Sequence, residues 1–120
     1  MKDKELNVFC SNVRGLVNNW SSIKKIKWDD YDIIGFNEIW GIKNYENLRI
    51  EGYEIKCQKI RESSRGGGTL IFGKKTLPTK VLNTPFVEGC FESTGVSIGK
   101  VIFLKFHGQL QHKNNQRVVL

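Results

Sequence analysis

The sequence predicts an α/β fold in which one helix accompanies mixed β-sheets. Short apolar runs of strand length recur along most of the 120 residues, some alternating with polar residues and some continuously apolar. Between the first two runs, apolar side chains recur at helical spacing. Many strands combined with a helical crossover are typical of an α/β sandwich.

The first strand covers residues 6–11, where apolar and polar residues alternate, and residues 13–15 form a turn. A short helix follows, since residues recur at helical spacing at Leu16, Trp20, Ile23 and Lys27, and Ile26 widens the apolar stripe. Asn18 or Asn19 is the expected helix cap. The helix should end before Asp29, with several lysines near its C-terminus, where the helix dipole favours cations.

The remaining apolar runs predict further strands: residues 33–36, 53–57, 69–72, 80–82, 94–98 and 101–106. The run at 33–36 is continuously apolar, as in a strand buried on both faces. Tyr53, Ile55 and Cys57 alternate with polar residues and should share one buried face. The last two runs should form a hairpin that turns at Gly99-Lys100. After Phe106 the pattern ends, which divides the chain into a domain at 1–106 and an unpatterned tail at 107–120.

The formal net charge of +7 indicates a polyanionic partner such as nucleic acid, although an ordinary basic protein has the same balance. The three cysteines are widely spaced and form no zinc-binding pattern, so they are expected to be buried thiols in an intracellular, reducing compartment. No apolar run approaches the roughly 18 residues that a membrane span needs, so no membrane partner is expected.

Two polar residues stand at the ends of apolar runs: Asn12 after the first and Glu38 after the second. Active sites of α/β folds lie where strands end and loops begin. A carboxylate fixed there suits a hard cation such as Mg²⁺, and an amide beside it can orient a phosphate. Taken alone, Asn12 is more typical of a turn and Glu38 of an exposed strand end. The two together favour a catalytic site.

Three segments together resemble the start of an endonuclease/exonuclease/phosphatase domain, with the endonuclease domains of non-LTR (LINE-type) retrotransposons nearest. The segments are Leu6-Asn7-Val8-Phe9-Cys10-Ser11-Asn12-Val13-Arg14-Gly15-Leu16, Asp32-Ile33-Ile34-Gly35-Phe36-Asn37-Glu38-Ile39-Trp40 and Gly66-Gly67-Gly68-Thr69-Leu70-Ile71-Phe72. They match a first strand that ends in Asn before a Gly-Leu turn, an Asp-Ile-(x)-(x)-(x)-(Gln/Asn)-Glu-(x)-Trp strand, and a glycine-led aliphatic strand. The likeness runs from about Leu6 to about Phe106 and covers the first half of the family's domain.

The resemblance implies a four-layered α/β sandwich of the DNase I-like type, truncated to its first half, with the site at the top edge of two facing sheets. It implies hydrolysis of a phosphodiester with Mg²⁺ or Mn²⁺, for which Glu38 and Asn12 are the catalytic and metal-binding residues. The implied partner is DNA, which Arg61 and Arg65 could contact. An intact element would carry a downstream reverse transcriptase domain and would act in the nucleus.

The sequence departs from the family in its later motifs. The family places a general base in an Asp-(x)-Asn motif and completes its site with Ser-Asp-His. In this sequence every aspartate lies within the first 32 residues, and neither His107 nor His112 follows Ser-Asp, so no catalytic role is expected of these histidines. Glu38 and Asn12 are therefore half a site, and we expect the isolated chain not to hydrolyse DNA. The glycines at 66–68 match no phosphate-binding motif and are expected to allow close packing of a central strand.

Two other functions stay open. The chain could be a non-catalytic, basic fragment that binds nucleic acid, in which case its affinity for DNA would depend on salt and not on Glu38. It could also be an inactive retroelement remnant, which would show neither binding nor catalysis.

Overall fold

The computed structural model describes residues 5–40, 48–61, 66–87, 91–99, 101–107 and 115–119. Within these ranges the chain forms one short helix and nine strands. In chain order they are β1 (Glu5–Asn12), α1 (Leu16–Ile23), β2 (Ile33–Asn37), β3 (Tyr53–Lys59), β4 (Thr69–Lys74), β5 (Lys80–Val81), β6 (Phe86–Val87), β7 (Phe91–Ile98), β8 (Val101–His107) and β9 (Asn115–Val119).

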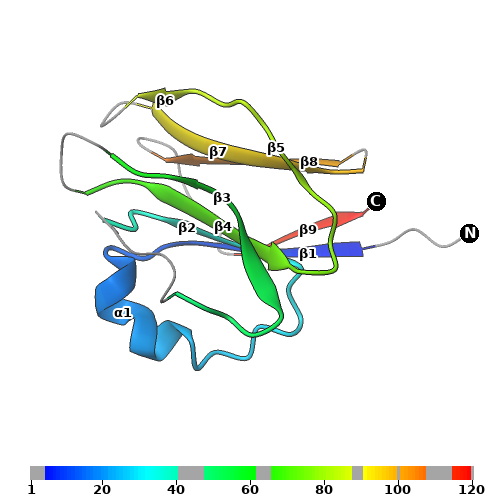
Figure 1. The fold of residues 1–120 in the computed structure, drawn as a ribbon, viewed down its shortest axis with the longest axis horizontal. Coiled ribbons are helices and arrows are strands. Elements are labelled where there is room, and N and C mark those ends of the chain that lie inside the picture. Colours follow the sequence, from blue (N-terminus) through cyan, green and yellow to red (C-terminus); the bar gives the residue numbers. More distant parts are fainter. Residues whose placement is uncertain are drawn as a thin grey trace, which may run out of the picture.

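Two sheets face each other, and α1 covers the outer face of the larger sheet (Figure 1). The larger sheet has the strand order β3-β4-β2-β1-β9, in which β1 and β2 are parallel and the other neighbours are antiparallel. In the second sheet β5, β6 and β8 all pair antiparallel with β7. The predicted α/β fold with mixed sheets is confirmed.

The central strand β2 is buried along its whole length, as its continuous apolar run predicts. Its side chains alternate between two cores. Ile34 and Phe36 point toward α1, whereas Ile33 points toward the second sheet. Each such fully buried side chain contributes about 1.5–3 kcal/mol relative to an exposed one. The side chains of β2 therefore stabilise the packing of the larger sheet against α1 on one face and against the second sheet on the other.

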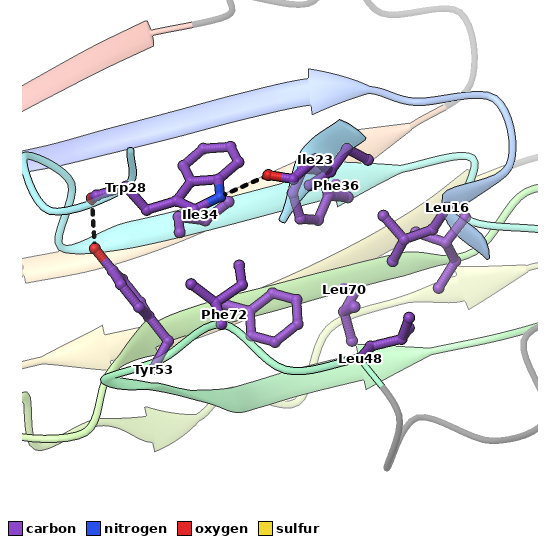
Figure 2. Close-up of a cluster of buried hydrophobic side chains, with 11 residues drawn as sticks. Leu16, Ile23, Trp28, Ile34, Phe36, Leu48, Tyr53, Leu70 and Phe72 are labelled. Atoms are coloured by element: carbon purple, nitrogen blue, oxygen red, sulfur yellow. Dashed lines mark hydrogen bonds between the residues drawn. The ribbon is translucent and has the colours of Figure 1, made fainter. Parts of the chain in front are cut away.

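The core between α1 and the larger sheet, hereafter the helix-side core, is rich in aromatic rings (Figure 2). Trp28 donates its indole Nε1–H to the carbonyl oxygen of Ile23, 3.0 Å away, just after the helix ends. The Tyr53 hydroxyl lies 2.5 Å from the carbonyl oxygens of both Trp28 and Tyr31. Phe9 packs edge-on against Trp28, with ring centroids 5.1 Å apart. The turn after α1 is thereby fastened to strand β3.

The helix differs from its prediction at both ends. It stops at Ile23, so the lysines that follow lie beyond its last turn. Its N-cap residue is Gly15, with φ of 97° and no capping side chain. The Asn19 amide instead donates backward to the carbonyl oxygens of Val13 and Gly15, at 3.1 and 2.9 Å. The predicted asparagine cap was wrong because that amide contacts acceptors before the helix and not its free N–H groups. In the described residues no helix has the length and apolarity needed to cross a membrane.

Strand β3 does not keep the predicted alternation, because a bulge lies between Ile55 and Cys57. Tyr53 and Ile55 belong to the helix-side core, whereas Cys57 points into the core between the sheets. The extra residue at the bulge is Lys56, whose Nζ donates to the carbonyl oxygen of Leu77 and pairs with the Glu54 carboxylate. One inserted residue therefore switches the rest of the strand to the other face.

The C-terminal part contains both confirmed and unpredicted elements. The hairpin of β7 and β8 is confirmed, with Ile98 opposite Val101, and β8 extends one residue further than predicted, to His107. The sequence indicated no strand after Phe106, yet β9 forms there and pairs antiparallel with β1. Cys10 and Cys57 are buried, as predicted, and burial raises the pKa of the Cys57 thiol. Cys90 lies outside the described residues.

Candidate functional site

A row of polar side chains crosses four strands of the larger sheet at the edge where β1 and β2 end. Asn12 of β1 lies opposite Asn37 of β2, and Thr69 of β4 lies opposite both Asn37 and Lys59 of β3. Residues directly opposite each other in neighbouring strands point to the same face of a sheet. We call these four residues the polar row. Two positions further along the strands, the same face carries the apolar inter-sheet core, which includes Cys10, Cys57 and Ile71.

The second sheet presents polar side chains to this row. Glu92 and Thr94 of β7 are buried and continue the two-residue spacing of Val96 and Ile98, which belong to the inter-sheet core. Because side chains two apart in a strand share a face, all four point toward the larger sheet. The space between the sheets is therefore apolar at one end and polar at the end where Asn12 lies.

An ion pair joins the two sides of this polar end. The Glu92 side chain is 1% exposed, and its Oε2 accepts a hydrogen bond from Arg61 Nε at 2.6 Å. Its Oε1 accepts the backbone N–H of Gly68 at 2.7 Å. The pair therefore fastens β7 to the segment that enters β4. Arg61, predicted to contact DNA, is directed to an internal carboxylate through its Nε.

Lys59 of the polar row also has partners. Its Nζ lies 2.6 Å from the carbonyl oxygen and 2.8 Å from Oγ1 of Thr84, and it donates to both. The Phe86 ring centroid lies 5.9 Å from the same Nζ, close enough for a cation–π contact. Both contacts are with the chain segment that leads into and forms β6, so Lys59 serves to join the two sheets.

Asn12 Oδ1, Thr69 Oγ1 and Thr94 Oγ1 are buried at this polar end without a hydrogen-bond partner. Buried polar atoms are nearly always paired, and an exception calls for water, an ion or a ligand. Leaving one such acceptor without a donor costs about 1–3 kcal/mol. These atoms make the polar end suited to receive a polar group or a hydrated ion.

Glu38 follows directly on β2, and the loops after β1 and β2 are joined by backbone hydrogen bonds. Gly15 N–H donates to the carbonyl oxygen of Glu38 at 2.8 Å, and Leu16 N–H donates to that of Ile39 at 3.1 Å. Glu38 has φ of 52°, an uncommon value for a residue other than glycine. Its side chain is half-buried, whereas Ile39 is fully buried in the helix-side core. The carboxylate is thus held at the end of a rigid strand.

A pocket of about 790 Å³ lies beside Glu38. Its lining combines residues from the start of α1, the end of β2 and the segment before β4: Gly15, Val17, Asn18, Glu38, Trp40, Arg61, Gly66 and Gly67. The structure therefore brings Glu38 and Arg61 together in one pocket. Asn12 belongs to the adjoining polar row and does not line the pocket, and Arg65 lies outside the described residues.

The glycines before β4 have the structural role that the sequence predicts. A Cβ atom on Gly67 would lie 2.1 Å from Arg61 Nε, and one on Gly68 would lie 2.9 Å from Ile39 Cγ1. Both also have positive φ, of 60° and 84°. Only glycine allows the backbone to pass beneath the Arg61 side chain and against Ile39 in this conformation.

The residues present fit part of the ligand set of a hard cation. Among the described residues, Glu38 is the one carboxylate that lines the pocket, and these residues contain no group of three or more histidine, cysteine or acidic side chains that could hold a metal ion. Magnesium sites commonly use one or two carboxylates together with water and substrate phosphates. Glu38 could therefore supply one ligand to Mg²⁺ or Mn²⁺, with the other positions filled by water or substrate, whereas Asn12 does not line its pocket.

Several residues of this region were missed in the sequence: Lys59, Thr69, Glu92 and Thr94. For Glu92 and Thr94 a signal was present, because they continue the inward alternation of Val96 and Ile98 with polar residues. A charged residue at an inward position of a strand indicates a buried partner or a site. Comparison of the chain with protein-family models, curated sequences and solved structures finds no match.

Proposed function

We propose that the chain supplies one half of the catalytic site of a DNA endonuclease of the retrotransposon type, a phosphodiesterase that depends on Mg²⁺ or Mn²⁺ and has a DNase I-like sandwich fold. The main support is the alignment of Asn12 with Asn37 at the ends of two parallel strands, with Glu38 as the next residue. The buried Asn12 Oδ1 without a hydrogen-bond partner gives further support, because a metal-bound water could donate a hydrogen bond to it.

Each residue has a distinct role in this proposal. Glu38 supplies the negative charge that holds the cation, and its position at a strand end limits its movement. Asn12 orients the ligands of the cation through its amide without adding charge. The bound metal would polarise the phosphoryl oxygens. Arg61 keeps Glu92 and the two sheets in place beside the site, so its contribution to DNA binding is secondary.

The proposal is limited to half a site because the aspartates in the described part of the chain lie far from Glu38. Asp32 precedes β2, so the full length of that strand separates it from Glu38. Six residues of extended chain correspond to about 20 Å. Asp29 and Asp30 lie at the same distant end, in the turn after Trp28. None of these three carboxylates could activate water at a phosphate bound near Glu38, so none of them is the general base.

Paramagnetic line broadening by Mn²⁺ tests the metal site directly. In ¹⁵N-labelled chain, we expect Mn²⁺ to broaden the amide signals of Gly15, Ile39 and Trp40 first. The Glu38→Gln variant should lose this selective broadening. Glu51→Gln is the matched control, because Glu51 is an exposed carboxylate in the turn before β3, and this variant should behave as the unmodified chain does.

Two outcomes would contradict the proposal. Broadening that persists in Glu38→Gln would place the cation elsewhere. Nicking of supercoiled plasmid by the isolated chain, dependent on Mg²⁺ and lost in Glu38→Gln, would show that the chain is a complete enzyme and not half of one.

A second candidate function is non-catalytic binding of nucleic acid, and the lysines after α1 favour it. Lys24, Lys25 and Lys27 are all exposed and lie within four consecutive residues. If these lysines contact the DNA, replacing all three with glutamine should weaken binding to duplex DNA. The slope of log affinity against log salt concentration should then fall by the equivalent of up to about three phosphate contacts. An unchanged salt dependence would exclude this surface.

A further inference from the structure

Trp40 is an exposed aromatic ring in the wall of the pocket beside Glu38. Its side chain is 43% exposed, whereas Trp28 is buried and Trp20 is half-buried and stacked on Phe72. Val17, also in the pocket lining, is exposed as well. Large apolar side chains that remain exposed beside polar groups in a concave site are typical of ligand contacts.

The ring is held in place although it is exposed. Trp40 donates its backbone N–H to the carbonyl oxygen of Gly67 at 3.0 Å, which ties it to the segment before β4. On the other side the ring rests against Gly15, where a Cβ atom would lie only 3.0 Å from Trp40 Cε3. A flat ring positioned in advance loses little entropy when a second ring stacks on it.

The same pocket receives Trp40 and Glu38 because the residue between them points the other way. Ile39 is inserted into the helix-side core, and the residues on both sides of it have positive φ, 52° at Glu38 and 59° at Trp40. Strained backbone of this kind in residues other than glycine is concentrated at functional sites. The carboxylate and the ring are therefore adjacent groups of one pocket, and a single nucleotide could contact both.

We propose that Trp40 is a stacking platform for an unpaired nucleobase next to the phosphate that the cation at Glu38 would hold. The identity of the ligand rests on the function proposed above, and the net charge of +7 suits a polyanionic chain. Val17 extends the apolar surface, and the Asn18 amide in the pocket lining can hydrogen-bond to a base edge. Every base offers a flat face, so the platform favours no particular sequence.

This platform selects for the structure of the DNA. In a continuous duplex the faces of the bases are covered by their neighbours, so a base must leave the stack before it can reach Trp40. We therefore expect tighter binding to single-stranded or bulged DNA than to continuous duplex of the same length. The corresponding substrate class is a phosphodiester beside an unpaired nucleotide.

The test measures binding of a dye-labelled oligothymidylate by fluorescence anisotropy, in EDTA so that no divalent metal contributes. We expect Trp40→Ala to weaken binding by roughly 5- to 150-fold, the factor that corresponds to stacking one base. Trp40→Phe should retain most of the affinity, because a smaller ring still stacks. Val81→Ala is the matched control, since Val81 is an exposed apolar residue on β5 in the second sheet, and it should bind as the unmodified chain does. Urea unfolding shows that each variant is folded.

An oligonucleotide of the same length with abasic sites separates contacts with bases from contacts with the backbone. Stacking predicts that it binds the unmodified chain as weakly as oligothymidylate binds Trp40→Ala. Equal affinity for the two oligonucleotides, unchanged affinity in Trp40→Ala, or no binding of oligothymidylate would each overturn the inference. Because this measurement excludes metal, its failure leaves the Mn²⁺ result at Glu38 unaffected, and the two proposals can fail separately.

Discussion

Removal of the Arg61 guanidinium should test whether the ion pair with Glu92 holds the two sheets together at the site. Arg61→Met keeps most of the length of the side chain but removes its charge. Glu92 would then be left 1% exposed and without its guanidinium partner, while still accepting the hydrogen bond from the Gly68 N–H. Breaking a buried ion pair from one side costs roughly 3–5 kcal/mol. The Gly68 hydrogen bond and the 17% exposure of Arg61 favour the lower end, about 3 kcal/mol.

A loss of that size is a large part of the 5–15 kcal/mol that typically stabilises a domain. For a chain of this length it corresponds to a decrease of roughly 10 °C in melting temperature. Urea unfolding followed by tryptophan fluorescence measures the free energy of unfolding. The double variant Arg61→Met/Glu92→Gln should recover most of the loss, because a neutral amide still accepts the Gly68 hydrogen bond and leaves no buried charge.

The pair of Lys74 with Asp32 provides the control. Their nearest charged atoms are 3.6 Å apart, and the two side chains are 35% and 24% exposed. Lys74→Met should therefore cost less than about 1 kcal/mol. The reasoning is refuted if Arg61→Met costs no more than Lys74→Met, or if Arg61→Met/Glu92→Gln is as unstable as Arg61→Met alone. Either result would mean that Glu92 is compensated by groups other than Arg61.

Two further predictions concern the core and the glycines. Burial, reinforced by the Asp29 carboxylate, raises the pKa of Tyr53 to about 12, above the value near 10 of an unfolded chain. The stability that this hydroxyl contributes is therefore complete below pH 10 and is lost as pH rises from 10 to 12. Tyr53→Phe should be less stable than the unmodified chain by about 1 kcal/mol at neutral pH. In urea unfolding, the variant should also lose less stability than the unmodified chain as pH rises. Gly68→Ala should cost about 1–3 kcal/mol more than Gly52→Ala, since both positions have positive φ but only at Gly68 would the added carbon meet a neighbour. Equal costs measured by thermal unfolding would show that backbone strain alone decides both.

The strands that carry the site could be predicted because their pattern is local. The continuous apolar run marks where β2 ends, and the alternating pattern marks where β1 ends. Glu38 stands at the first of these ends and Asn12 at the second. The pairing of Asn12 with Asn37 requires only that β1 and β2 be parallel neighbours, which a strand–helix–strand unit normally provides. The candidate residues were found for this reason, while their metal-binding role stays a prediction.

Features that depend on distant partners could not be predicted in the same way. The bulge at Lys56 depends on the register of β3 against β4. The alternation in the sequence therefore predicted one shared face for Tyr53, Ile55 and Cys57, whereas in the structure Cys57 lies on the opposite face. Glu92 is ordered by residues 24 and 31 positions away. The strand β9 is formed by a polar segment and depends on pairing with the edge of β1. In each case the interacting partners are too far apart in the sequence for a local pattern to indicate the contact.

The reversal of direction at Ile39 separates what maintains the fold from what would carry out the chemistry. Ile39 lies in the core, whereas the residues on either side of it contribute only their backbone to the hydrogen bonds that join the loops. Replacement of Glu38 or Trp40 therefore leaves the packed interior as it is. Over generations these two positions could accept other carboxylates, amides or rings, and so other ligands, without first passing through an unstable protein.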